Sequence, residues 1–435
     1  MTSTSEPSPL VPVPAGRATN WKSPAMAARV ARRYRSERIF EHLGLAALVI
    51  AVGFLLFLLG TMLRDGLSGF LATETRIEVT LDPQTLELGE DRSEQAIRTA
   101  NFIDVYYRDV KASLGDAGPA VASNNGWALI RDEVAARPEL VGQMRTFWVP
   151  VKSAIDQFAK GRIDGDVPAE FSRVTPAQIS AYERLKAEGL IRTSINRSFL
   201  FTGDSTAPES AGIWGAFVGS VLTILVTLAL AFPIGVLSAV YLEEYAPKNR
   251  WTDLVEVSIN NLAAVPSIIF GLLGLAIFLN TMNMPRSAPL VGGLTLALMT
   301  LPVIVIASRA AIKSVPPSIR DAALGVGASR VQAVFHHVLP LALPGMLTGT
   351  IIGVARALGE TAPLLMIGMR AFIVDPPRSF IDPATVLPVQ IFLWSDDVDR
   401  GFVEKTSAAI IVLLVVLLMI NGLAIYLRNK FERRW

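Results

Sequence analysis

An arginine and a glutamate stand inside an apolar stretch, where charged side chains need a reason. Arg356 and Glu360 lie four residues apart in ARALGETAPLL. A charge near the middle of a membrane span costs about 3 kcal/mol even on lenient insertion scales, so it normally faces a partner or a wet cavity. Two interpretations are open. The two side chains could form a self-neutralising i, i+4 ion pair that locks a helix interface. Alternatively, Arg356 could offer positive charge to an oxyanion in a translocation path while Glu360 holds it or tunes release.

Small residues recur at every fourth position of the helix expected around this pair. Such a seam permits another helix to approach closely. At about 100° per residue, Arg356 and Glu360 lie within about 60° of Gly353, so they flank the seam and need not face lipid. Thr361 follows directly and joins them as a candidate path residue. The seam consists of Gly345, Gly349, Gly353 and Ala357, and Thr361 continues its spacing.

Arg309 is a weaker candidate for the same path. It stands near the end of the apolar block 289–312 and is followed by Lys313. A long cationic side chain at a span end can also extend to the lipid headgroups, which is an equally ordinary use of arginine.

A polar loop, 313–340, precedes the charged span and carries dense helix signals. Pro316 and Pro317 bar a helix from entering upstream, and Ser318 with Asp321 has the spacing of a capping box. We expect a first short helix from Ile319 that ends at Gly325 and Gly327. Ser329 with Gln332 repeats the capping pattern and predicts a second short helix, which Pro340 closes. Its apolar face consists of Val331, Val334, Phe335 and Val338.

An apolar face on a polar loop suggests a docking surface. The alternative is a helix that lies on the membrane surface or on the protein's own spans. The sequence contains no Gly-x-x-x-x-Gly-Lys-Ser/Thr loop, so nothing in it would cradle nucleotide phosphates in the usual way. If transport needs ATP, we expect the nucleotide to bind a separate subunit on which this loop docks, and we expect no cofactor in this chain.

Composition identifies a membrane protein without redox or metal chemistry of the common kinds. Hydrophobic residues make up 51% of the 435 positions and arrive in long blocks. There is no cysteine and there are three histidines, so neither a disulfide framework nor a histidine metal cluster is expected. We find no catalytic constellation and expect no enzymatic activity.

The chain divides into a tail, an anchor, a soluble domain and a membrane domain. Residues 1–42 form a cytoplasmic tail that begins Pro-rich and disordered and becomes basic between Arg29 and Arg38. The apolar run 43–63 is read as an uncleaved anchor rather than a signal peptide, since its polar lead is long. Residues 64–212 have the composition of a soluble domain, with helices over 90–114 and 175–188 and a strand over 77–81. The membrane domain 213–435 has spans at 213–242, 254–279, 289–312, 341–367 and 408–427, an outward loop at 368–407 and a tail at 428–435.

Lysine and arginine in the connections set the orientation. They concentrate beside 248–250, in 313–330 and in 428–434, on one side of the membrane. Both termini and the loop 313–340 are therefore expected in the cytoplasm, and residues 64–212 outside it.

Several spaced motifs resemble a known family. The stretch RDAALGVGASRVQAVFHHVLP resembles the signature loop of ABC importer permeases. Asp321 replaces the usual glutamate, and His337 replaces an aliphatic residue. ARALGETAPLL, LEEYAP and AVPSIIFG are similar, more narrowly, to the A-type permease subunit of phosphate importers. The resemblance covers about 196–435 and the first span. The matching positions are Asp321, Ala322, Ala323, Gly327, Leu339 and Pro340.

This resemblance implies an all-α polytopic protein with six spans of type I ABC importer architecture and an enlarged, mainly helical periplasmic domain. It implies a phosphate permease in the bacterial inner membrane. The partners would be a second related permease, two copies of a cytoplasmic ATPase, a periplasmic phosphate-binding protein and lipid, without nucleic acid. It favours the path over the ion-pair interpretation of Arg356. A permease for molybdate or phosphonate and a membrane-anchored receptor remain as alternatives. The resemblance assigns no role to residues 64–212.

Overall fold

The computed structural model describes residues 24–89, 91–163 and 173–431, and it divides into two units, 1–61 and 62–435. The described residues of the first unit all lie in one helix, α1 (Pro24–Gly66). The last residues of this helix belong to the second unit. It is long and apolar enough to cross a membrane. The expected disordered part of the tail lies largely outside the described residues.

A small antiparallel sheet organises the soluble part of the second unit, which we call the sheet domain (residues 67–201). The 3-10 turn η1 (Leu67–Phe70) leads into β1 (Leu71–Thr80), the central strand between β2 (Met144–Pro150) and β3 (Ile191–Ile195). The helices around it are α2 (Glu94–Thr99), α3 (Phe102–Leu114), α4 (Gly118–Val121), α5 (Gly126–Ala136), α6 (Ser153–Ala159), α7 (Pro176–Ala187) and α8 (Arg197–Phe201), with 3-10 turns η2 (Gly115–Ala117) and η3 (Pro138–Leu140).

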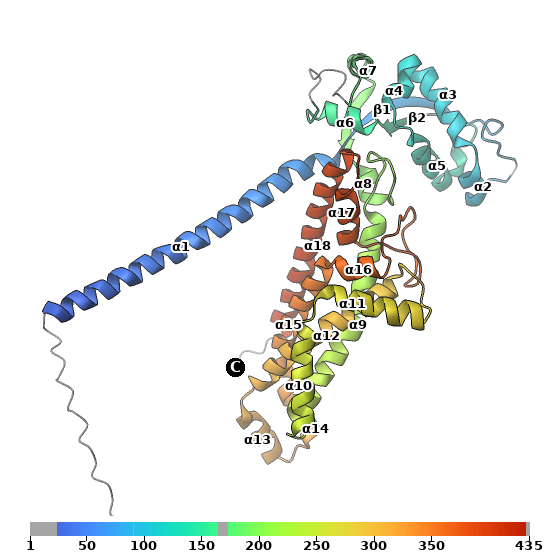
Figure 1. Ribbon diagram of the computed structural model, residues 1–435. Coiled ribbons are helices and arrows are strands. Elements are labelled where there is room, and N and C mark those ends of the chain that lie inside the picture. The colour runs from blue at the N-terminus through green and yellow to red at the C-terminus, as the bar shows by residue number, and fades with distance from the viewer. Residues whose placement is uncertain (1–23, 90, 164–172, 432–435) are drawn as a thin grey trace, which may run out of the picture. The chain divides into compact units, whose positions relative to one another are not determined.

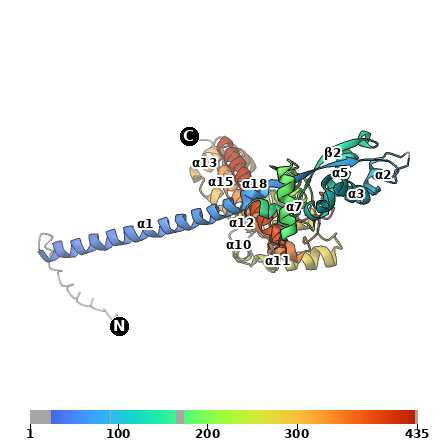
Figure 2. The same cartoon turned by 90° about the horizontal axis from the view of Figure 1, so that it is seen from above.

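Alternation along β1 explains how this sheet domain gets its core. Ile77 and Val79 are buried, whereas Arg76 and Glu78, which alternate with them, are exposed, so one sheet face packs against the helices. Figures 1 and 2 show α2, α3 and α5 gathered beside the β1–β2 part of the sheet, with α6 and α7 at the other part.

Two sequence predictions for this domain need correction, and one is confirmed. The strand is longer than 77–81. The helix expected over 90–114 is two helices, because Asn101 interrupts it: its side chain accepts a hydrogen bond from the backbone N–H of Asp104 and caps α3. The capping box of Thr175 and Gln178 at the start of α7 is confirmed.

Buried charges join the sheet domain to the last membrane helix, α18 (Gly401–Phe431). Lys160 Nζ lies 2.7 Å from Asp156 Oδ2 and 2.9 Å from Glu404 Oε1, and its side chain is 10% exposed. It also donates to the carbonyl of Leu71. The lysine therefore bridges α6, the start of β1 and the first turn of α18.

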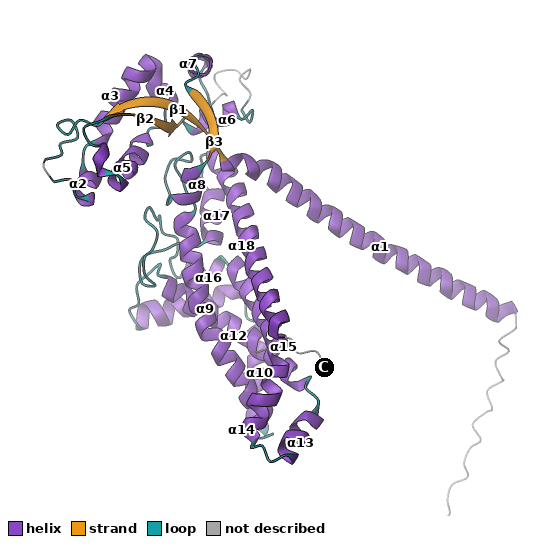
Figure 3. Ribbon diagram, turned by 180° about the vertical axis from the view of Figure 1, so that it is seen from behind, coloured by secondary structure: helices purple, strands orange, loops and turns teal. Residues whose placement is uncertain are grey.

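The remaining elements form a helical bundle (Figures 1 and 3). Five helices among the described residues are long and apolar enough to span a membrane, or six if a bent pair counts as one span. The bundle elements are α9 (Trp214–Val240) with the π-helical turn η4 (Tyr241–Tyr245), α10 (Arg250–Ala263), α11 (Ser267–Gly274) with η5 (Leu275–Thr281), α12 (Pro289–Lys313), α13 (Pro317–Gly325), α14 (Arg330–Ala333) with η6 (Val334–Val338), α15 (Leu339–Gly359), α16 (Ala362–Met366), α17 (Leu387–Ser395) and α18.

Two spans expected as continuous helices are broken. The span 254–279 is the pair α10 and α11, bent by 101° at residues 264–266. The span 341–367 ends its first helix at Gly359 and resumes at Ala362. Pro266 ends the first break, and the residue before a proline is driven out of helical geometry. Pro363 is the second residue of α16, a position in the first turn where a proline's missing N–H is tolerated. The segment 368–407, expected to be an outward loop, contains α17 and the first turns of α18.

Candidate functional site

The small-residue seam of α15 lies against α12. A Cβ on Gly349 would lie 2.1 Å from the Cβ of Ala307, and one on Gly345 would lie 2.7 Å from the Cβ of Ala311. Gly353 is less tightly enclosed, with its nearest neighbour at 3.7 Å, and Ala357 is buried. The absence of side chains at 345 and 349 is what brings the two helix backbones together.

Alanine at position 349 should therefore destabilise the protein. The added methyl must push α12 and α15 apart or force a backbone shift, which typically costs about 1–3 kcal/mol. Thermal unfolding in detergent would measure this, with Gly422→Ala as the matched control because no atom lies within 4 Å of a Cβ there. A melting temperature of Gly349→Ala equal to that of the control would contradict the tight seam.

Arg356 and Glu360 stand at the broken end of α15. Glu360 has an extended backbone (φ −79°, ψ 122°), so it caps the helix rather than continuing it. Arg356 Nε lies 3.5 Å from Glu360 Oε1, which is at the outer limit of a hydrogen bond. Thr361 occupies the single residue between Glu360 and α16. Three of the four candidate path residues, all but Arg309, thus lie at one helix break.

The two broken spans pack against each other beside this break. A Cβ on Gly271 of α11 would lie 2.6 Å from the Cα of Pro363, the second residue of α16. Val265, within the break between α10 and α11, packs on the buried cluster that contains Ala357 and Leu364. Discontinuous helices that meet within the membrane are where transporters commonly place substrate sites, because only there is irregular backbone available to a ligand.

Arg356 is more exposed than the carboxylate with which it pairs. Its side chain is 46% exposed and that of Glu360 is 20% exposed. Among the described residues, Glu360 is the ion-pair partner of Arg356, and at 3.5 Å it leaves most guanidinium donors available. A half-exposed arginine inside an apolar block must meet a wet path or another polypeptide. Its planar fork of N–H groups fits a tetrahedral oxyanion.

The loop 313–340 has two helical pieces with different boundaries from those expected. The capping box at Ser329 and Gln332 is confirmed. The one at Ser318 and Asp321 is wrong, because α13 begins at Pro317 and has no side-chain cap. The second piece also does not close at Pro340: α14, η6 and α15 follow one another without a gap. Pro340 is the second residue of α15 and directly follows the π-helical turn η6, so it lies inside a continuous helix instead of ending one.

The apolar residues of this loop divide between the protein's own core and its surface. Val334 and Val338 are buried in a cluster with Ile312 and Ala342, so they are not available for docking. Val331 and Phe335 are exposed. Two exposed apolar residues that the sequence analysis did not single out, Leu324 and Val326, lie at and just after the end of α13, and Val326 is 86% exposed. Asp321, Ala322 and Gly327 are exposed, whereas Ala323 is buried.

Arg309 is buried among carboxylates instead of extending toward headgroups. Its Nε lies 2.5 Å from Glu243 Oε1 and its Nη2 lies 2.7 Å from Glu256 Oε2, with 11% of its side chain exposed. With two carboxylates already bound, it has less to offer an anion than Arg356 has. No local pattern in the sequence indicated these partners, which are more than fifty residues away in the chain.

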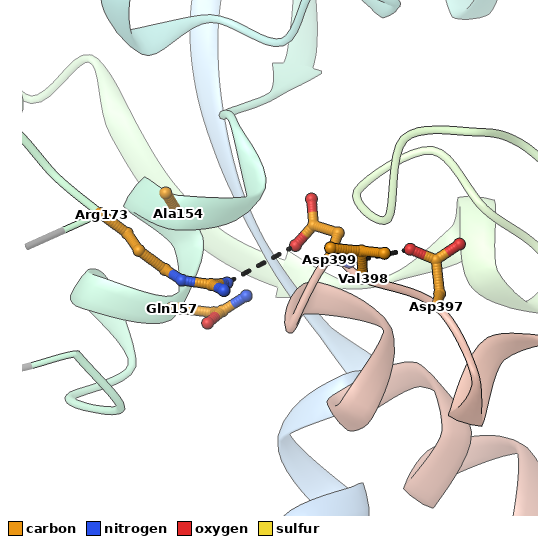
Figure 4. A pocket seen from close by; sticks show the side chains of 6 residues that line it. All are labelled: Ala154, Gln157, Arg173, Asp397, Val398 and Asp399. Atoms are coloured by element: carbon orange, nitrogen blue, oxygen red, sulfur yellow. Dashed lines mark hydrogen bonds and ion pairs between the residues drawn. The ribbon is translucent and has the colours of Figure 1, made fainter.

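The protein also has a cavity away from Arg356, and this cavity is poorly suited to an anion. It has a volume of about 520 Å³ and lies between α6 and the segment before α18. Figure 4 shows Gln157 and Arg173 on one side and Asp397 and Asp399 on the other, with Arg173 joined to Asp399 at 4.0 Å. Next to it, burial raises the pKa of Asp204, whose carboxylate accepts a hydrogen bond from the indole of Trp394. Two carboxylates against one guanidinium would repel a phosphate.

The bundle of long apolar helices, with two helix breaks packed against each other, is that of a polytopic membrane protein. The family model described as "Binding-protein-dependent transport system inner membrane component" matches residues 231–435, and a domain of unknown function, DUF3333, matches residues 27–169. The phosphate transport system permease protein PstA of Haemophilus influenzae is 31% identical over 51% of this chain and 78% of its own length. That of Yersinia pestis is 31% identical over 52% and 76%. The methionine transporter MetNI has a solved chain that is 17% identical, with a TM-score of 0.40 over 51% of this chain and 95% of that one.

The chain belongs to the PstA family of ABC transporter permeases. Members of this family are transport components.

Proposed function

We propose that this protein is the A-type permease subunit of an ATP-driven phosphate importer and that Arg356 contacts the anion during transport. The relatives named as phosphate permeases support the substrate. The observation that carries the site is Arg356 itself, a half-exposed guanidinium at the meeting of two broken membrane helices. Glu360 holds the arginine while the path is empty and competes with the anion, so that binding does not become too tight to release.

A second, related permease completes the path. Helix α10 supports this, since none of its residues is buried within the chain although Trp251, Leu254 and Val257 are large and apolar. An amphipathic helix with no partner in its own chain is expected to pack on another subunit or on lipid. A periplasmic phosphate-binding protein delivers the anion to the outer face.

Energy enters from two copies of a cytoplasmic ATPase that bind the loop 313–340, because this chain has no nucleotide-binding loop of its own. The exposed apolar side chains Leu324, Val326, Val331 and Phe335 supply the contact. The chain holds no cofactor. It lies in the inner membrane with both termini cytoplasmic and residues 64–212 periplasmic, as the lysine and arginine distribution favours.

A comparison of phosphate uptake by cells with and without the gene tests the substrate. Cells with the gene should accumulate labelled phosphate, and unlabelled phosphate should compete at lower concentrations than molybdate or phosphonate. Deletion should remove this uptake, and the intact gene on a plasmid should restore it. Phosphate uptake that is unchanged by deletion, or displaced better by another oxyanion, would contradict the phosphate assignment.

A further inference from the structure

Five charged side chains tie the loop helix α13 to three membrane helices at the end of the bundle farthest from the sheet domain. Three are carboxylates and two are guanidinium groups, and none belongs to the set singled out from the sequence except Arg309. We call this group the two-armed clamp: Glu243, Glu244, Glu256, Arg309 and Arg320.

The first arm holds the loop. Arg320 lies in α13, one residue before Asp321, and its Nε and Nη2 lie 3.0 and 2.6 Å from Glu244 Oε1. The same guanidinium donates to the carbonyls of Val315 at 2.8 Å and Ile312 at 3.1 Å, at the end of α12. Four hydrogen bonds from one planar group fix its orientation as well as its position. The loop helix therefore cannot shift without pulling on the ends of α9 and α12.

The second arm holds the membrane helices to one another. Arg309 of α12 reaches Glu243 at the end of α9 and Glu256 in α10. The side chains of Arg309 and Glu243 are 11% and 12% exposed. Removing one partner from so enclosed a pair leaves an uncompensated charge, so the link resists separation.

Both arms meet at one π-helical turn. Glu243 and Glu244 are consecutive residues of η4, so their side chains diverge by roughly 100° and can reach separate partners. π-helical turns are rare and concentrate at functional positions. From Glu256 the chain continues along α10 to the break at 264–266 and into α11, whose Gly271 lies against Pro363 just past Glu360 and Thr361. An unbroken series of contacts thus runs from the loop to the candidate path.

We propose that Glu243 and Glu244 are positioning residues for transport: they carry displacement of the loop helix α13 through the two-armed clamp to α9, α10 and α12, and so to the break beside Arg356. This inference rests on the proposed docking of the ATPase on the loop 313–340. Neither glutamate touches the anion. The two glutamates couple movement of the loop to opening of the path. The strength of this coupling is a free energy between two distant sites.

The chain has no cysteine, which allows a reversible test. The double variant Glu244→Cys with Arg320→Cys is assembled with all partner subunits in proteoliposomes. A bis-methanethiosulfonate reagent about as long as the two lost side chains then bridges the thiols, and dithiothreitol removes the bridge. Phosphate uptake per ATP hydrolysed should fall about tenfold in the unbridged variant, recover on bridging and fall again on reduction. Each single-cysteine variant receives the same reagent as a control.

The ion pair of Glu74 and Arg192, joined at 2.7 Å in the sheet domain, provides the matched control pair. Its double-cysteine variant should transport normally with and without the bridge. Glu244→Gln should reproduce the loss while Lys313→Gln, whose exposed amine lies 3.4 Å from Glu243, should not. Normal coupling in the unbridged double variant and in Glu244→Gln, or a loss that bridging does not restore, would overturn the clamp. An unmutated complex whose hydrolysis ignores phosphate and its binding protein would instead contradict the importer function on which the clamp rests.

Discussion

Glutamine at position 356 is expected to reduce phosphate uptake at least about 30-fold, because loss of one partner of a charged hydrogen bond to the anion typically costs about 2–5 kcal/mol. Uptake of labelled phosphate by the reconstituted complex measures this. Assembly should be unaffected, since the side chain is half exposed and its ion pair with Glu360 is long. Arg356→Lys should keep part of the activity, because lysine retains the charge but not the planar fork.

Two controls distinguish a role of Arg356 in the transport path from a purely structural ion pair with Glu360. Arg286→Gln removes an exposed arginine from the connection before α12 and should leave uptake unchanged. Glu360→Gln removes the other partner of the ion pair. If the pair only locks a helix interface, Arg356→Gln and Glu360→Gln should lower both the melting temperature and uptake to the same extent. If Arg356 binds the anion, Glu360→Gln should leave the melting temperature unchanged and tighten binding with slower release. Normal uptake by Arg356→Gln would exclude the proposed role.

The sequence indicated the long apolar helices, because apolar runs of the required length have few alternatives. It predicted their interruptions less well. Pro266 stands in the middle of one block, and its effect there is a break with a sharp bend instead of a gentle kink. Pro363 stands near the end of another block, where a proline can equally well open a helix, so the span 341–367 was expected to continue across it. Local signals identify a proline, but the packing of α11 on α16 determines how far the chain turns.

The loop shows a second limit of sequence patterns. Val331, Val334, Phe335 and Val338 have the spacing of one helical face, and that spacing is the same whether the face binds a partner or the protein's own core. The structure divides them: Val334 and Val338 pack in the bundle, which leaves the other two exposed. The position of the neighbouring helix α12 decides whether a residue of this face is buried or exposed.

The partners of Arg309 could not have been found from spacing at all. Glu243 and Glu256 approach it from other helices, and a carboxylate near a span end is ordinarily read as a solvated residue. LEEYAP was informative as a family motif. Nothing in it indicated that its two adjacent glutamates, Glu243 and Glu244, form ion pairs with different arginines. Such pairs depend on the fold and not on local periodicity.

Aspartate at position 327 is expected to uncouple hydrolysis from transport. Gly327 has φ +95°, in the conformational region that glycine alone adopts easily, and it links α13 to the start of α14. Any L side chain there adds strain on the order of 1–3 kcal/mol, which the loop can relieve by turning α13 away from α14. That movement would displace Leu324 and Val326, which we propose to contact the ATPase.

Gly325→Asp is the matched control for this prediction, because it adds the same charge two residues earlier. The backbone there is helical, and no atom lies within 4 Å of a Cβ at either glycine. Gly327→Asp should lose phosphate-stimulated hydrolysis and uptake together while the basal hydrolysis of the ATPase persists, and Gly325→Asp should retain most of both. Because strain is the only difference between the two variants, equal losses would assign the effect to charge at the contact surface. Retained stimulation in Gly327→Asp would show that the angle between the two loop helices does not govern coupling.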